Sequence, residues 1–147
     1  MYDRILVPTD GSAAADRAID HAVRLSRATG ATIHVLSVID RVPAVDVGGG
    51  ETLVGDVSAA ATRTVEQART RIESDGVTPI TATDSGVPYR RILEYADDED
   101  VDLIVMGTRG RTGIERHLLG SVTEKVVRLS DVPVLTVRET EAEGTDA

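Results

Sequence analysis

The architecture is clearest in residues 101–126, VDLIVMGTRGRTGIERHLLGSVTEKV, where a buried strand leads through a loop into a helix. The opening run, residues 101–107, is the most apolar in the chain, which is typical of a strand covered on both faces. Residues 107–126 then hold four glycines and three arginines. On both sides of the Gly120-Ser121 step, apolar residues recur at helical spacing and predict one helix face, formed by Leu118, Leu119, Val122, Val126 and Leu129.

The same alternation of strand and helix extends over the rest of the chain. Short apolar or β-branched runs predict strands at 5–8, 31–39, 78–84, 101–107 and 132–137. Helical patterns run from Ser12 to a cap at Gly30, over 57–74, from Pro88, and from Gly120. Strands separated by helices require crossover connections. The sequence therefore predicts an α/β fold with a five-stranded parallel sheet, doubly wound and Rossmann-like.

The length and composition indicate a single domain. A chain of 147 residues with 41% hydrophobic content can bury one core. We expect the domain to occupy residues 1–138. Within it, the proline and glycines of residues 40–56 predict a flexible insertion. Residues 139–147, ETEAEGTDA, predict an acidic, disordered tail.

The charge balance is strongly acidic, with 25 Asp and Glu against 16 Lys and Arg and a net charge of -9. This argues against nucleic-acid binding, which depends on clustered basic residues. The acid excess, with Lys125 the only lysine, is similar to the surface chemistry of halophile proteins. An ordinary acidic mesophile protein is the alternative. Because cysteine is absent, disulfides, thiolate metal sites and cysteine nucleophiles are excluded.

No segment has the apolar length of a membrane span, and the N-terminal residues MYDRILVPTDG lack the pattern of a signal peptide. We therefore expect a cytoplasmic protein without membrane contact.

Two loops are candidates for a ligand site, because open parallel sheets bind ligands beyond the carboxyl ends of their strands. One follows Pro8 and the other follows Met106. At Gly107 and Gly110, the missing β-carbon would let backbone adopt positive φ and let a ligand approach.

The start of the following helix is the second part of the predicted anion site. The helix N-terminus, with the Ser121 and Thr123 hydroxyls, would attract phosphate. The alternative is structural: Ser121 and Glu124 would form a capping box and the glycines would only make turns. The loop is neither a Walker A motif, because no lysine precedes Ser121, nor a G-x-G-x-x-G motif.

The glycine spacing Gly107-x-x-Gly110, nine residues, then Gly120-Ser121 resembles the signature of the universal stress protein family, in its ATP-binding branch. The resemblance covers nearly the whole chain. It includes ILVPTDGS (5–12), HVLSVID (34–40), DLIVMGTRGRTG (102–113) and LLGSVTEKVVRLSDVPVLTVR (118–138).

The resemblance implies a binding site for ATP, or for AMP or ADP, with Mg²⁺ or Mn²⁺ bridging the phosphates. Adenosine would be lined by Pro8, Thr9 and Asp10, and the backbone of Val38 would read the adenine edge. The positions that match the ribose and phosphate loop are Met106, Gly107, Arg109 and Gly110. Those that match the phosphate-holding helix start are Gly120, Ser121, Val122 and Thr123.

Simpler roles remain open for several of these residues. Asp10 could end its strand through an Asx-turn. Arg109, Arg111 and Arg116 could be solvated loop charges. His117 could have a catalytic role, but the sequence shows no set of carboxylate, histidine and nucleophile residues that would support it. We therefore predict no catalytic residues, and we also predict no protein metal ligands.

The predicted function is an adenine-nucleotide-binding regulatory protein of the stress response, acting as a switch with at most slow hydrolysis. One alternative is an interaction module of the same fold that dimerises without nucleotide. Another is a related adenine-nucleotide enzyme, although the His-x-Gly-His and Ser-Gly-Gly-x-Asp-Ser motifs of such enzymes are absent. We expect a homodimer through residues 132–137, because a short apolar edge strand tends to pair with another chain. The sequence names no protein partner.

Overall fold

A computed structural model describes residues 2–40, 50–109 and 119–139, apart from the side chains of residues 50–57. The strands are β1 (Arg4–Pro8), β2 (Thr32–Asp40), β3 (Ile80–Gly86), β4 (Leu103–Gly107) and β5 (Val134–Val137). The helices are α1 (Ala13–Thr29), α2 (Gly50–Glu73), α3 (Pro88–Asp98) and α4 (Ser121–Leu129). Strand and helix alternate as the sequence predicts.

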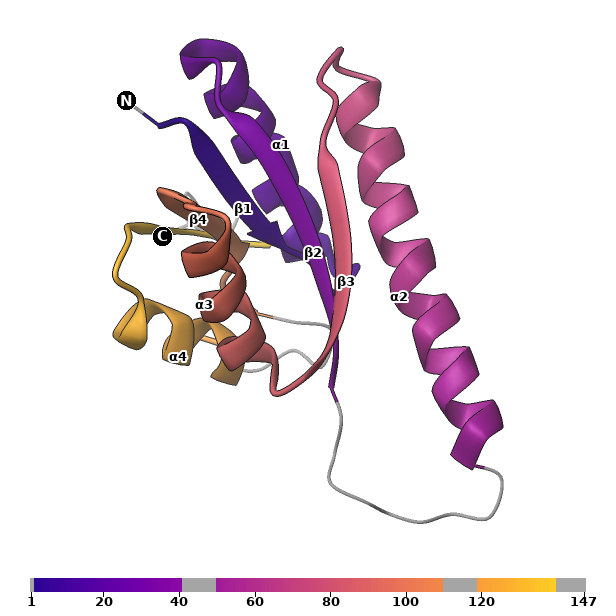
Figure 1. The fold of residues 1–147 in the computed structure, drawn as a ribbon. Coiled ribbons are helices and arrows are strands. Elements are labelled where there is room, and N and C mark those ends of the chain that lie inside the picture. The colour runs from indigo at the N-terminus through magenta and orange to yellow at the C-terminus, as the bar shows by residue number, and fades with distance from the viewer. Residues whose placement is uncertain (1, 41–49, 110–118, 140–147) are drawn as a thin grey trace, which may run out of the picture.

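The strands form one parallel sheet in the order β3-β2-β1-β4-β5 (Figure 1). The chain first winds outward from β1 through β2 to β3, then returns to β4 on the other side of β1 and continues to β5. The strand order therefore reverses between β1 and β4, which is the switch point of a doubly wound sheet. The predicted fold class is confirmed.

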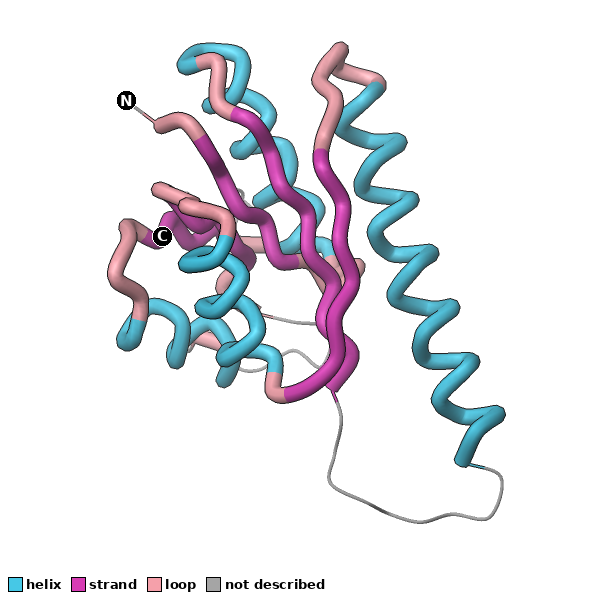
Figure 2. Tube along the Cα trace, viewed as in Figure 1, coloured by secondary structure: helices cyan, strands magenta, loops and turns pink. Residues whose placement is uncertain are grey.

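Helices cover both faces of the sheet (Figure 2). Between α1, α2 and one face lies a core of small and β-branched side chains, which includes Ile5, Ala18, Ile33 and Val65. Between α3, α4 and the other face lies a second core, which includes Leu6, Leu36, Ile92 and Val126. Neighbouring residues of β1 and β2 enter opposite cores, because side chains alternate across a strand. This explains why apolar residues stand side by side in both strands, as in residues 5–7 of β1 and 35–36 of β2.

Helix α1 begins and ends where the sequence predicts. Ser12 is the N-cap, and its hydroxyl oxygen accepts a hydrogen bond of 3.2 Å from the amide of Ala15. Gly30 is the C-cap, with φ of 80° in the left-handed region that favours glycine. The Ser12 cap fixes the start of α1 directly after the turn that follows β1, and the Gly30 cap fixes its end.

Helix α2 differs from the prediction, because it begins at Gly50 and not at residue 57. The stretch 50–56 is thus helical backbone and not loop. A helix can extend through a weak glycine position once its following turns are packed, here by Ala61, Val65, Ala68 and Ile72. The predicted insertion is therefore shorter at this end, and residues 41–49 lie outside the described residues. Strand β3 also lies two residues later than predicted.

Helix α4 begins at Ser121, with Gly120 as its N-cap. Leu119 therefore precedes the helix, and Leu118 lies outside the described residues. Val126 is fully buried as predicted, but Leu129 is 51% exposed. The prediction for Leu129 was wrong because the helix ends there, beyond the edge of the core beneath α4.

Candidate functional site

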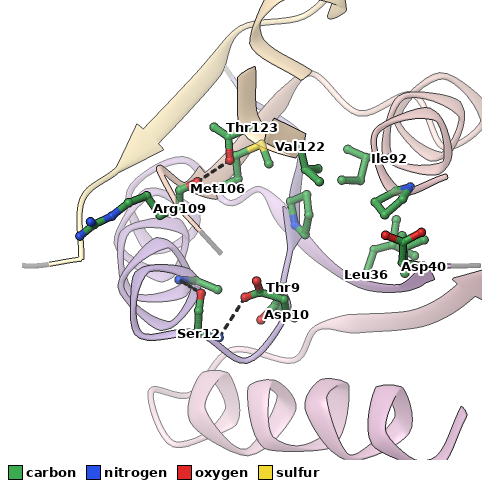
Figure 3. A pocket seen from close by; sticks show the side chains of 15 residues that line it. Thr9, Asp10, Ser12, Leu36, Asp40, Ile92, Met106, Arg109, Val122 and Thr123 are labelled. Atoms are coloured by element: carbon green, nitrogen blue, oxygen red, sulfur yellow. Dashed lines mark hydrogen bonds between the residues drawn. The ribbon is translucent and has the colours of Figure 1, made fainter. Parts of the chain in front are cut away.

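A cavity of about 280 Å³ opens at the carboxyl edge of the sheet, next to the switch point between β1 and β4 (Figure 3). Its volume is near the lower end of the range for small-molecule sites. Its walls come from the ends of three strands and the first turns of three helices. The lining residues are Pro8, Thr9, Asp10, Ser12, Ala15, Leu36, Val38, Asp40, Pro88, Ile92, Met106, Gly107, Arg109, Val122 and Thr123.

The turn between β1 and α1 is held by its own side chains. The hydroxyl oxygen of Thr9 accepts a hydrogen bond of 3.1 Å from the amide of Gly11, and Asp10 Oδ1 accepts one of 2.9 Å from the amide of Ser12. Gly11 makes this turn possible with φ of 79°. The Asx-turn considered for Asp10 is therefore present. It also fixes the carboxylate at the rim of the cavity, so the structural role does not exclude a binding role.

The end of β4 lies unusually close to α1. A β-carbon built on Gly107 would stand 2.7 Å from the Cβ of Ala14 and 2.9 Å from its carbonyl carbon. Gly107 also has no positive φ. The expectation that Gly107 is needed for a positive φ was wrong. Gly107 lines the cavity as expected, and it also permits close contact between the strand and the helix.

Helix α4 is attached to the end of β4 by two hydrogen bonds. The hydroxyl of Thr123 donates to the carbonyl oxygen of Gly107 over 2.8 Å, and the amide of Gly120 donates to that of Thr108 over 2.6 Å. Thr123 is buried and its one hydroxyl proton is already used. In this arrangement the Thr123 hydroxyl positions the helix, and a role of Thr123 in phosphate binding stays a prediction.

The capping-box alternative for Ser121 is also wrong. The N-cap is Gly120, which makes no side-chain cap hydrogen bond, and Ser121 is the first residue of the helix. The first intrahelical bond runs from the amide of Glu124 to the carbonyl oxygen of Gly120. The amides of residues 121–123 precede that bond and form the positive end of the helix dipole. The Ser121 side chain is exposed beside them.

Arg109 contributes a cation to the cavity wall. Its guanidinium donates a hydrogen bond of 2.9 Å to Oε2 of Glu139, and the Arg109 side chain is 18% exposed. Figure 3 shows the guanidinium directed away from Thr9 and Asp10, toward the end of the last strand. Sequence reasoning placed Glu139 in the tail and missed this pair.

The structure brings most of the predicted site residues together. Those that line the cavity are Pro8, Thr9, Asp10, Val38, Met106, Gly107, Arg109, Val122 and Thr123. Gly120 and Ser121 adjoin the cavity at the start of α4 without lining it. Gly110, Arg111, Arg116 and His117 lie outside the described residues.

Six lining residues were missed by sequence reasoning: Ser12, Ala15, Leu36, Asp40, Pro88 and Ile92. For Pro88, the rules for parallel sheets could have predicted a place in the site. In a parallel sheet, each helix that follows a strand begins at the carboxyl edge, so Pro88 at the start of α3 belongs at the same edge as Pro8 and Met106.

The two sides of the cavity differ in chemistry. Leu36, Val38, Ile92 and Val122 form an apolar wall, which suits a flat, weakly polar ring. Across from it lies a polar rim that includes Thr9, Asp10 and Ser12 (Figure 3). This combination fits a nucleoside.

The electrostatic surroundings of the rim are acidic. Burial raises the pKa of Asp16 in the first turn of α1, and the carboxylates of Asp20 and Asp10 add to this effect while Arg71 opposes it. Across residues 2–40, 50–109 and 119–139, no group of three or more His, Asp or Glu side chains is arranged to hold a metal ion. Over the same part of the chain, no helix has the length and apolar character needed to cross a bilayer.

An open parallel sheet with a cavity at its switch point defines the doubly wound α/β class of ligand-binding proteins. The model of the Universal stress protein family matches residues 1–138. The chain therefore belongs to the universal stress protein family, and the resemblance to this family found in the sequence is confirmed.

Individual relatives agree with this assignment. The universal stress protein MJ0531 of Methanocaldococcus jannaschii is 35% identical over 146 residues, which cover 97% of this chain and 86% of the relative. The solved structure of MJ0577 from the same organism has a TM-score of 0.82 at 32% identity, covering 96% of this chain and 99% of that one. A universal stress protein solved in complex with cAMP has a TM-score of 0.73 at 29% identity, covering 95% and 99%.

Proposed function

We propose that this protein binds an adenine nucleotide in the cavity at the carboxyl edge of its sheet and acts as a stress-response regulator. The observation that carries the proposal is the pairing of an apolar wall and a polar rim beside the N-terminus of α4. The relative in complex with cAMP supports the same ligand class. ATP is our preferred ligand, because the Gly107, Gly110 and Gly120-Ser121 spacing resembles the ATP-binding branch.

In this proposal, the adenine ring packs against the apolar wall and its edge meets the backbone of Val38. The carboxylate of Asp10, held by its Asx-turn, accepts hydrogen bonds from the ribose. The phosphates approach the start of α4, where the amides and the Ser121 hydroxyl donate. Thr123 holds that helix start in place through Gly107.

A divalent cation, Mg²⁺ or Mn²⁺, would neutralise part of the phosphate charge when the nucleotide is bound. Among the residues that the structure describes, Asp10 and Asp40 are the carboxylates that line the cavity. They are too few for a dedicated protein site, so the ion would be held mainly by the nucleotide. The protein would supply position and the helix dipole.

The protein's regulatory output would come from nucleotide-dependent conformation or partner choice, with at most slow hydrolysis.

We also propose that two copies pair through β5. Leu135 on this edge strand is 39% exposed, and Leu129 and Val127 of the adjacent α4 are 51% and 43% exposed. An apolar edge of this kind favours association. If the protein dimerises and binds no adenine nucleotide, the interaction module becomes the better description.

The acid excess and the single lysine support a halophilic origin for the protein, and we propose that it works in the cytoplasm. Surface carboxylates that repel one another in dilute buffer would be screened in concentrated salt.

The proposal is tested by the small molecules that the protein carries. Freshly purified protein is denatured, and the released compounds are identified by mass spectrometry. Recovered ATP, ADP or AMP in amounts comparable to the protein would support the proposal. The proposal would be contradicted by two results together: the released ligand belongs to another chemical class, and ATP, ADP and AMP each fail to bind after that ligand has been removed.

A further inference from the structure

The pair formed by Arg109 and Glu139 is built by the register of the sheet. Strands β4 and β5 are parallel, with Met106 opposite Thr136 and Gly107 opposite Val137. The amide of Thr108 continues the pairing by donating to the carbonyl oxygen of Val137 over 2.9 Å. Two residues beyond the Gly107–Val137 pair, the chain reaches Arg109 on one side and Glu139 on the other.

This register holds the carboxylate of Glu139 against the guanidinium at 2.9 Å. The Arg109 side chain is 18% exposed, whereas that of Glu139 is 46% exposed. The arginine is thus largely enclosed and the glutamate is the solvent-facing partner. Such a carboxylate can move away from the arginine without disturbing the core.

The direction of the arginine matters for the proposed ligand. Arg109 lines the cavity, yet its guanidinium points toward the end of β5 and away from Thr9 and Asp10 (Figure 3). Guanidinium groups bind carboxylate and phosphate oxygens with the same paired geometry. A ligand phosphate that uses Arg109 must therefore replace the Glu139 carboxylate or share the cation with it.

We propose that Glu139 is a built-in competitor for the phosphate of the ligand, so that it weakens the binding of phosphate-bearing nucleotides and leaves that of the bare nucleoside unchanged. The inference rests on the proposed function, because it assigns a regulatory contact to the same cavity. Glu139 acts through Arg109 and does not touch the adenosine part. Any change that neutralises Glu139 or draws it away from Arg109 would raise the affinity for nucleotide.

The test is titration calorimetry of ATP and adenosine at fixed Mg²⁺ against the unmodified protein, Glu139→Gln, Arg109→Gln and the double variant. We expect Glu139→Gln to tighten ATP binding about three- to tenfold. Two effects add up to this gain: Arg109 is released from a partly exposed ion pair, and one negative charge near the phosphates is removed. Adenosine binding should change less than about twofold. In the Arg109→Gln background, Glu139→Gln should have no selective effect on ATP.

Glu66→Gln is the matched control, since Glu66 forms a surface ion pair with Arg69 at 3.5 Å on α2 and its loss changes the net charge equally. The inference is overturned if ATP binds the unmodified protein and Glu139→Gln leaves its affinity unchanged or weaker. A gain that also appears with Glu66→Gln, or that persists without Arg109, overturns it as well. If neither ligand binds any of the proteins, it is the proposed function that fails.

Discussion

The side-chain hydroxyl of Thr123 donates a hydrogen bond of 2.8 Å to the carbonyl oxygen of Gly107 and so joins the first turn of α4 to the last residue of β4. Both residues line the cavity, and a β-carbon on Gly107 would collide with Ala14 of α1. The end of β4 is therefore fixed between two helices. This contact sets where the start of α4 lies relative to the rest of the site.

Replacing Thr123 with valine should lower the free energy of unfolding by about 1–3 kcal/mol, because it removes the buried donor and keeps the side-chain shape. Urea unfolding followed by circular dichroism measures the change. Thr123→Ser keeps the hydroxyl and should recover part of the loss. A Thr123→Val protein as stable as the original would show that the hydrogen bond contributes nothing to the joint.

A second prediction concerns His34, which lies buried on β2 beneath α3. Its Nδ1 is 2.7 Å from the hydroxyl oxygen of Tyr95. Burial lowers the pKa of His34 below 6.5, with a smaller opposing effect from Glu99 and a smaller supporting one from Arg4. In the window between that lowered pKa and 6.5, the unfolded chain binds more protons than the folded one. Stability should therefore fall as the pH is lowered through this window.

Denaturant unfolding of the original protein and of His34→Gln at pH 7.5 and 5.0 isolates this effect, because glutamine does not titrate. The variant should lose less stability on acidification. The pKa of Asp20 is lowered by the hydrogen bond from Arg71 and that of Asp16 is raised by burial, but both carboxylates are present in the two proteins, so their contribution cancels in the comparison. Equal losses for both proteins would contradict the assignment to His34.

The proposed dimer predicts that Thr136→Pro shifts the protein to a monomer. The carbonyl oxygens of Pro133 and Val137 accept from β4, so the amide of Thr136 lies on the free side of the edge strand, where proline removes it as a donor. Light scattering after size exclusion, at micromolar concentration, gives the mass directly. Ile80→Pro is the matched control, since Ile80 begins the opposite edge strand and is 49% exposed. A monomeric mass for the unmodified protein would refute the dimer.

The acid excess predicts that molar KCl stabilises the fold. The net charge of -9 produces repulsion among carboxylates, which salt screens. The midpoint of thermal unfolding should rise steadily as KCl increases. A midpoint that stays flat or falls would remove the halophilic interpretation.

The order of elements could be predicted because strong local signals and the rules for parallel sheets agree. Ser12 and Gly30 cap α1 as predicted, and the buried runs of β1 and β4 place their two loops at one edge. The start of α2 at Gly50 could not be predicted, since packing of later turns overrides the weak helix propensity of glycine.

Only those parts of the candidate site that lie at the ends of strands could be predicted from the sequence. Asp40 and Ile92 enter the cavity because of how β2 and α3 are placed, and no local motif marks either residue. The pairing of Arg109 with Glu139 depends on the register between β4 and β5. Register is a property of the assembled sheet, and for that reason Glu139 was assigned to the tail.

The central claim is tested most directly by filling the cavity and measuring ATP binding. Val38 is half-buried and lines the cavity, so Val38→Phe should place a ring where the adenine is proposed to lie. Ile80→Phe adds the same bulk at an exposed position at the start of β3, where the cavity does not reach. Titration calorimetry with Mg-ATP should show binding to the original protein and to Ile80→Phe, and a loss of at least about tenfold in affinity for Val38→Phe. Unchanged ATP binding by a folded Val38→Phe protein, or the absence of ATP binding by the original, would contradict the account.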